Sequence, residues 1–117
     1  MGARETPVVK ACREVLDILG VPNVRLNSGL AWKGKCPIKL AEPGWPDILG
    51  VLPGGRTLGV ECKAPELPGL YRKKRAGTRS AVQVAIHERL GKQGALVITC
   101  TSSMEMCEKL RKAGFYL

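Results

Sequence analysis

Two short apolar runs joined by a glycine turn constrain the fold of this chain more than any other feature. Residues 47–52 and 57–64 are rich in aliphatic and β-branched side chains, and Pro53-Gly54-Gly55-Arg56 separates them. This arrangement predicts a β-hairpin, whose two strands run antiparallel. The start of the first strand then lies beside the end of the second.

The remaining segments predict helices and strands around this hairpin. Apolar residues recur at helical spacing in 6–19 and 80–92, and a last helix is expected between Ser102 or Ser103 and Gly114. Further strands are expected at 24–27 and 95–100, while residues 28–46 read as a long loop with room for a short strand near Ala31-Trp32. The order α-β-β-β-α-β-α predicts one α/β domain over residues 1–117, with a mixed central sheet flanked by helices.

Charged residues fall at unusual places on the two hairpin strands. Asp47 opens the first strand after Pro46, and Glu61 and Lys63 lie within the second. Side chains alternate across a strand, so Glu61 and Lys63 share one face, and the hairpin brings Asp47 towards them. Two carboxylates are the hard oxygen ligands that Mg²⁺ or Mn²⁺ prefers, and a neighbouring lysine suits phosphodiester hydrolysis. These residues therefore predict a metal-dependent site for phosphate chemistry.

A simpler interpretation is open for each part of this pattern. A Glu-x-Lys tripeptide on a strand is commonly a solvent-facing charge pair, and Pro-Asp before a strand is often only a turn. The ordered combination is more specific than either part, because Gln83 then follows on the next helix. His87 lies one turn beyond Gln83, and we expect it at the surface or behind the site rather than in it.

Read in order, these residues resemble the PD-(D/E)xK nuclease superfamily, and within it the stand-alone VRR-NUC (virus-type replication-repair nuclease) domain. The resemblance covers nearly the whole chain and implies a restriction-endonuclease-like core. It rests on five segments: Glu5 at the head of the first helix, Arg25-x-Asn27-Ser28-Gly29, Gly44-Trp45-Pro46-Asp47-Ile48, Val60-Glu61-Cys62-Lys63-Ala64, and Ser80-x-x-Gln83.

The resemblance implies a role for each matching position. Asp47 and Glu61 are expected as ligands of Mg²⁺ or Mn²⁺, with the main-chain carbonyl of Cys62 as a further ligand. Lys63 corresponds to the catalytic lysine, and Gln83 reaches from its helix to the metal site or the scissile phosphate. Glu5 is expected as the first-helix acid that completes the metal site, and Glu14 on the same helix competes for that role. No organic cofactor is implied.

The net charge indicates a polyanionic partner. Nineteen Lys and Arg against ten Asp and Glu give +9, and the surplus lies in two acid-free segments, 18–41 and 67–87, on either side of the hairpin. A mobile, solvated charge run is the alternative interpretation of the second segment. The residues expected to contact nucleic acid are Lys33, Lys35, Lys39, Tyr71, Arg72, Lys73, Lys74, Arg75 and Arg79.

These features together predict an endodeoxyribonuclease of the hydrolase class. The resemblance implies nicking or resolution of branched, Holliday-junction-like DNA by a homodimer, in a viral, phage or DNA-repair setting. A non-catalytic nucleic-acid-binding module on the same fold and a small RNA-binding protein are the competing hypotheses.

The cysteines and the hydropathy indicate the compartment. The five cysteines are an odd number without a C-x-x-C pair, so a disulfide framework and a structural zinc site are not expected. Cys12, Cys62 and Cys100 lie among apolar neighbours and are expected in the core of a protein from the reducing cytoplasm. The sequence contains no long apolar run and no secretory signal, so we expect no membrane partner.

Overall fold

The structure, a computed structural model, describes residues 6–26, 30–39, 43–65 and 79–116. Three helices and six strands lie within these ranges. In chain order they are α1 (Thr6–Ile18), β1 (Asn23–Arg25), β2 (Leu30–Lys33), β3 (Cys36–Lys39), β4 (Ile48–Val51), β5 (Thr57–Cys62), α2 (Ala81–Lys92), β6 (Leu96–Cys100) and α3 (Ser103–Lys112).

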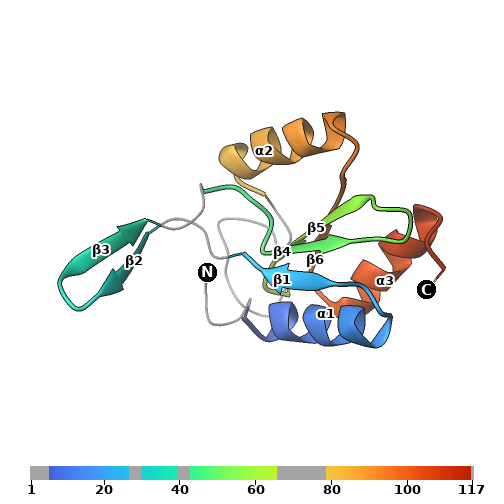
Figure 1. Cartoon of the computed structure of the whole chain (residues 1–117), viewed down its shortest axis with the longest axis horizontal. Coiled ribbons are helices and arrows are strands. Elements are labelled where there is room, and N and C mark those ends of the chain that lie inside the picture. Colours follow the sequence, from blue (N-terminus) through green and yellow to red (C-terminus); the bar gives the residue numbers. More distant parts are fainter. Residues whose placement is uncertain (1–5, 27–29, 40–42, 66–78, 117) are drawn as a thin grey trace.

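A mixed four-stranded sheet forms the centre of the molecule. Its strand order is β1-β4-β5-β6, with antiparallel pairs up to β5 and a parallel pair between β5 and β6. A parallel pair needs a crossover connection, which here contains α2. Helices α1 and α3 lie on one side of the sheet and α2 on the other (Figure 1). The expected α/β class with a mixed sheet flanked by helices is confirmed.

The hydrophobic core fills the space between the sheet and the pair α1 and α3. Alternate residues of β5, Leu58, Val60 and Cys62, point into it and are fully buried. They meet Cys12 and Leu16 of α1 together with core residues of α3, among others. The other face of β5 carries Gly59 and Glu61, which are also buried, so this strand is covered on both sides.

The hairpin predicted from the two apolar runs is present, with slightly shorter strands. Ile48 pairs with Val60 and Val51 with Thr57, and both turn glycines have φ of +87°. That left-handed conformation explains the Gly54-Gly55 pair, since other residues adopt it only with strain. The helix expected over 80–92 begins at Ala81, with Ser80 as its N-cap.

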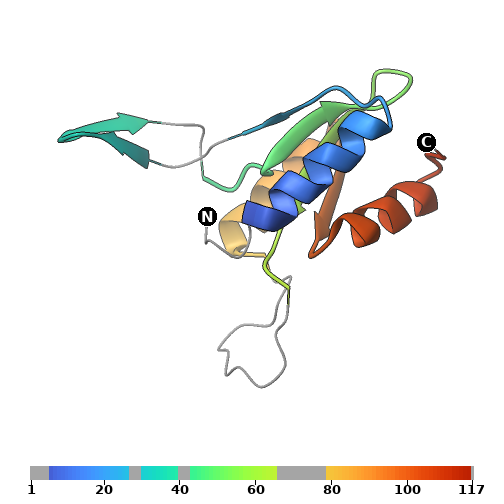
Figure 2. The ribbon, with the colours of Figure 1, turned by 90° about the horizontal axis from the view of Figure 1, so that it is seen from below.

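The segment expected as a long loop holds a second hairpin. Strands β2 and β3 pair antiparallel in a two-stranded sheet of their own, with Gly34 at the turn at φ +62°. Figures 1 and 2 show this hairpin projecting away from the four-stranded sheet. The short strand expected near Ala31-Trp32 is present as β2. The expectation of a loop was wrong for β3, because Pro37 and the scattered lysines mask the alternating pattern.

Among the described helices, none is both long and apolar enough to cross a membrane.

Candidate active site on strand β5

Asp47 lies immediately before β4, where the β4–β5 pairing begins. Its Oδ2 accepts a hydrogen bond of 2.8 Å from the main-chain N–H of Cys62. Its own main-chain carbonyl accepts the N–H of Leu26 at 2.7 Å, which extends the pairing of β1 with β4. Because Ile48 pairs with Val60, one further step along this register places Asp47 beside Glu61. The structure thus brings together the two carboxylates that the sequence singled out.

A close approach between Pro46 and Gly59 sets the position of Asp47. A methyl group on Gly59 would lie 2.8 Å from Cγ of Pro46 and 3.3 Å from its Cβ. Pro46 is itself buried and directly precedes Asp47. Only glycine at position 59 therefore allows Pro46 to pack directly on β5.

Glu61 is almost completely buried, with 2% of its surface exposed. A carboxylate in such a place must be paired or hydrogen-bonded, because removing its charge from water is costly. The side-chain N–H of Gln83 donates to Oε1 of Glu61 at 3.0 Å. Glu61 is therefore a buried, hydrogen-bonded acid and not the solvent-facing charge of the simpler interpretation.

Gln83 links three parts of the site through one amide group. Its Oε1 accepts from the ammonium group of Lys63 at 2.7 Å and from the main-chain N–H of Ser80 at 2.9 Å. Its Nε2 donates to Glu61, so the amide has a single satisfactory orientation. The bond to Ser80 is one half of a capping box, in which the Ser80 hydroxyl accepts the N–H of Gln83. The start of α2 is therefore tied to the face of β5 that carries Glu61.

Lys63 follows the last residue of β5 and is partly buried. Its N–H donates to the carbonyl of Cys100 at 2.9 Å, which continues the parallel pairing of β5 with β6. Its side chain lies on the same face as Glu61, as alternation predicts, and is held by Gln83. The ammonium group therefore has a defined position beside the two carboxylates.

The carboxyl groups influence each other strongly. Burial, followed by the hydrogen bond and the charge of Glu61, raises the pKa of Asp47 from 3.8 to about 7. The N–H of Cys62 and the charge of Lys63 oppose this rise without cancelling it. Two crowded carboxyl groups that resist simultaneous ionisation form a place where a cation is strongly favoured.

His87 is a buried neighbour of Glu61. The residue is 4% exposed, and its Nε2 lies 3.7 Å from Oε1 of Glu61. Within the described part of the chain this Nε2 has no hydrogen-bond partner, while Nδ1 lies 3.1 Å from the guanidinium of Arg79. Burial, then the charges of Arg79 and Lys63, lower the pKa of His87, so the ring is neutral. With Nδ1 accepting from Arg79, the ring proton sits on Nε2 and faces Glu61.

Comparison with known structures finds a similar fold. A solved structure described as a "VRR_NUC domain" superposes with a TM-score of 0.62 at 26% sequence identity, over 97% of this chain and 100% of that chain. The chain has a VRR-NUC fold. No protein-family model and no curated protein matches the sequence.

Some of the remaining residues expected at the site lie within the described part of the chain, and others lie outside it. Glu14 is exposed on α1, and this helix lies on the opposite side of the sheet from α2 (Figure 1). Glu5 lies outside the described residues, as do Tyr71, Arg72, Lys73, Lys74 and Arg75. Of the other basic residues, Lys33 and Lys39 belong to β2 and β3, Lys35 is exposed in their turn, and Arg79 contacts His87.

The sequence left the place of His87 open between the surface and a position behind the site. The structure places it behind the site, buried against Glu61. His87 is four residues after Gln83, and residues at this spacing share a helix face. Gln83 and His87 therefore approach the same carboxylate from consecutive turns of α2.

Proposed function

We propose that this VRR-NUC domain is a metal-dependent endodeoxyribonuclease that hydrolyses phosphodiester bonds. The observation that carries the proposal is the pairing of Asp47 with Glu61 beside the Lys63–Gln83 contact. A module that only binds nucleic acid gains nothing from two carboxylates facing a phosphate, since like charges repel. The nuclease fold and this cluster are mutually consistent.

The donor set fits a divalent cation. Carboxylate oxygens are the preferred ligands of Mg²⁺ and Mn²⁺, and the pKa of Asp47 is raised first by burial and then by the neighbouring Glu61. Asp47, Glu61 and the main-chain carbonyl of Cys62 would hold the ion, with Glu5 as the proposed first-helix acid. When bound, the ion would supply Lewis-acid activation of the scissile phosphate and of the attacking water.

Lys63 and Gln83 supply the protein's own part of the reaction. The ammonium group of Lys63 would orient or deprotonate the attacking water, or offset the negative charge that builds up on the phosphate. Gln83 holds Lys63 and Glu61 at once, so it would fix the distance between the lysine and the metal site. This preorganisation is what charge stabilisation of a transition state requires.

The substrate would be DNA, and the two basic segments, 18–41 and 67–87, would bind its phosphates. Lys33, Lys35 and Lys39 lie on or in the turn of the projecting hairpin, and Arg72, Lys73, Lys74, Arg75 and Arg79 with Tyr71 would make the second contact. A homodimer would present two sites to one branched DNA such as a Holliday junction. Viral replication or DNA repair in the cytoplasm of a bacterial or phage-infected cell would be the setting.

A cleavage assay on defined DNAs tests the proposal. Plasmid, linear duplex, single-stranded and four-way-junction DNA, with RNA in parallel, are incubated with Mg²⁺, Mn²⁺ or EDTA. We expect metal-dependent cleavage of DNA, most rapid on the junction. The Lys63→Ala protein should bind the junction but not cut it, and Lys112→Ala, changed at an exposed lysine of α3, should cut normally.

Two results of that assay would overturn the proposal. Binding without cleavage under any metal condition would support the alternative of a non-catalytic nucleic-acid-binding module. Cleavage that persists in EDTA or in the Lys63→Ala protein would mean that a contaminating nuclease is being measured.

A further inference from the structure

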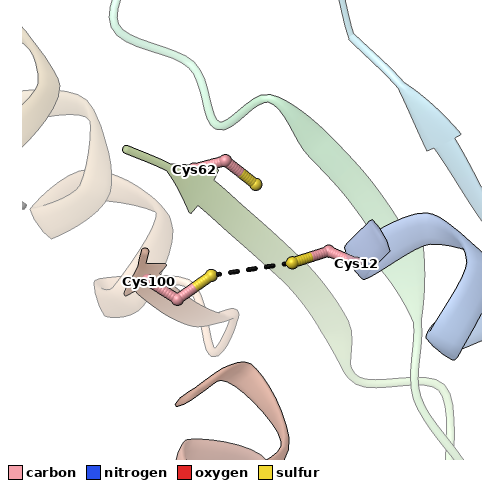
Figure 3. Close-up of side chains that lie close together, drawn as sticks. All are labelled: Cys12, Cys62 and Cys100. Atoms are coloured by element: carbon pink, nitrogen blue, oxygen red, sulfur yellow. Dashed lines mark hydrogen bonds between the residues drawn. The ribbon is translucent and has the colours of Figure 1, made fainter. Parts of the chain in front are cut away.

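Three cysteines from three different elements meet in the core. Cys12 of α1, Cys62 of β5 and Cys100 of β6 each expose 1% or less of their surface. Their sulfur atoms all lie within 4.8 Å of one another, and those of Cys12 and Cys100 are 3.8 Å apart (Figure 3). Cys62 and Cys100 are register partners on neighbouring parallel strands, and Cys12 faces them from the helix.

The spacing of these sulfurs suits a shared metal ion. Metal–sulfur bonds of about 2.3 Å place the ligand sulfurs about 3.8 to 4.0 Å apart, for tetrahedral and trigonal geometry respectively. The Cys12–Cys100 pair already has this separation, and the third sulfur needs to move by less than 1 Å. Changes of this size lie within the reach of small side-chain rotations.

The number of sulfur ligands and their chemical type indicate which metal ion the three cysteines would bind. Zinc in structural sites takes four ligands, whereas within the described residues no fourth His, Cys, Asp or Glu joins these three. The burial of all three residues keeps bulk solvent away from the position that a fourth ligand would take. Soft sulfur ligands at low coordination number favour Cu(I) among the biological metals.

We propose that Cys12, Cys62 and Cys100 form a buried three-sulfur site for Cu(I). The site uses a different atom of Cys62 from the candidate active site: its sulfur points into the core, while Glu61 and Lys63 on either side of it point towards α2. Strand β5 therefore carries a soft sulfur ligand, Cys62, on one face and a hard oxygen ligand, Glu61, on the other. Ligand type sorts metals, so Mg²⁺ or Mn²⁺ would not compete for the cysteines.

The competing interpretation is that the three thiols only fill space in the core. Cysteine is among the most frequently buried residues, and the contact between Cys12 and Cys100 is compatible with a weak thiol hydrogen bond. The two interpretations differ in one measurable respect. Only a metal site joins α1, β5 and β6 through an ion, so only a metal site makes the stability of the fold depend on that ion.

The test is anaerobic titration of the full chain with Cu(I) in the presence of a chromophoric Cu(I) chelator and a non-thiol reductant. Since the sulfurs are buried, the protein is loaded both in the folded state and by refolding with the ion present. We expect one Cu(I) per chain, thiolate-to-copper charge-transfer absorption, and a rise in Tm. Slow uptake by the folded chain and ready uptake on refolding are expected for a buried site.

Variants connect the bound ion to the cluster. Cys12→Ala and Cys100→Ala should each lose the ion and the rise in Tm, whereas Cys36→Ala and Cys107→Ala, changed outside the cluster, should keep both. Circular dichroism of each metal-free variant establishes that it folds. Absence of bound Cu(I) after refolding, or its loss in the Cys36→Ala or Cys107→Ala protein, would overturn the proposal.

Discussion

At the scale of single residues, the candidate active site is organised around one buried acid and the groups that surround it. Glu61 sits on the central strand, where an isolated carboxylate would be strongly destabilising. Gln83 donates to it, Asp47 lies beside it with a raised pKa, and the Nε2 of His87 faces it. Each of these neighbours can be altered to separate a structural contribution from a catalytic one.

Gln83 takes part in the capping box of α2 and also contacts Lys63 and Glu61. A substitution at this position, compared with one at Ser80, distinguishes the two roles. Gln83→Glu keeps an oxygen for Ser80 and Lys63 but places a second carboxylate against Glu61 in place of a donor. Loss of a hydrogen bond to a charged group predicts a decrease in kcat/KM of about tenfold to a hundredfold. Steady-state cleavage of a junction DNA measures it.

Ser80→Ala is the matched control, because it removes only the hydroxyl that accepts the N–H of Gln83. It should lower the stability by about 1 kcal/mol, as for other lost N-caps, and leave cleavage nearly unchanged. Equal losses of activity in the two variants would show that the cap, rather than the contact with Glu61, governs catalysis.

The pH dependence of stability follows from Asp47. Its pKa is about 7 in the folded, metal-free chain and 3.8 when unperturbed, so between these values the folded chain holds a proton that the unfolded chain has lost. Stability conferred by this group is therefore full below pH 3.8 and declines as the pH rises to about 7. Thermal unfolding in EDTA across this window measures the decline.

Asp47→Asn mimics the protonated group permanently, since its amide can accept from Cys62 and donate to Glu61. We expect a metal-free variant that is more stable than the wild type above pH 7 and nearly equal to it below pH 4. A wild-type advantage in Tm that grows with pH would contradict this assignment.

At the scale of elements, the approach of the segment before β4 to strand β5 decides where Asp47 lies. Strand pairing sets the register of Asp47 against Glu61. The absence of a side chain at Gly59 allows Pro46 to pack directly against β5. Helix α2 closes the same face through its capped first turn. The site is therefore built from the ends of elements that pack on one strand.

Gly59→Ala tests this packing. The added methyl group would meet Pro46 at 2.8 Å, so Pro46 and Asp47 must shift. Overpacking of this kind typically costs about 1 to 3 kcal/mol, and we expect slower cleavage as well. Chemical denaturation and the cleavage assay measure the two effects.

Gly91→Ala provides the contrasting change in α2. Nothing lies within 4 Å of the added methyl group, and alanine favours a helix, so stability should rise by about 0.5 to 1 kcal/mol with cleavage unaffected. A destabilised Gly91→Ala protein, or a Gly59→Ala protein as stable and active as the wild type, would refute the packing argument.

At the scale of the whole molecule, the sheet separates two environments. One face meets α1 and α3 across an apolar core that contains the three thiols, and the other meets α2 across the carboxylates (Figures 1 and 3). The β2–β3 hairpin projects away from the four-stranded sheet (Figure 2), and its turn carries the exposed Lys35. Part of the positive charge of the chain is therefore placed on an element that projects from the sheet.

The hairpin's contribution can be measured through salt dependence. Binding of junction DNA in EDTA should weaken steeply with salt, because phosphate contacts release counterions. Lys35→Ala should reduce the slope of log K against log salt by about 0.9 if Lys35 neutralises one phosphate. Lys112→Ala is the control, and a slope that is identical in both variants and the wild type would remove the hairpin from the binding surface.

Much of the site could be predicted from the sequence because it is encoded locally. The Gly-Gly turn and strand alternation suffice to place Asp47 near Glu61 and to put Lys63 on the same face as Glu61. The start of the Gln83 helix was equally visible, since Ser80 and Gln83 form a capping box with standard spacing. The β2–β3 hairpin was missed because its proline and lysines obscure the alternation on which strand prediction depends.

The sequence by itself determined the hairpin, the order of the central strands along the chain and the candidate carboxylates, since these depend on neighbours within about twenty residues. Only the tertiary structure decided that Gln83 bridges Lys63 and Glu61, that His87 is buried, and that Cys12, Cys62 and Cys100 meet. Cys12 and Cys100 are 88 residues apart in the chain. Contacts of that kind arise from how helices pack on a sheet, and no local periodicity records which faces will meet.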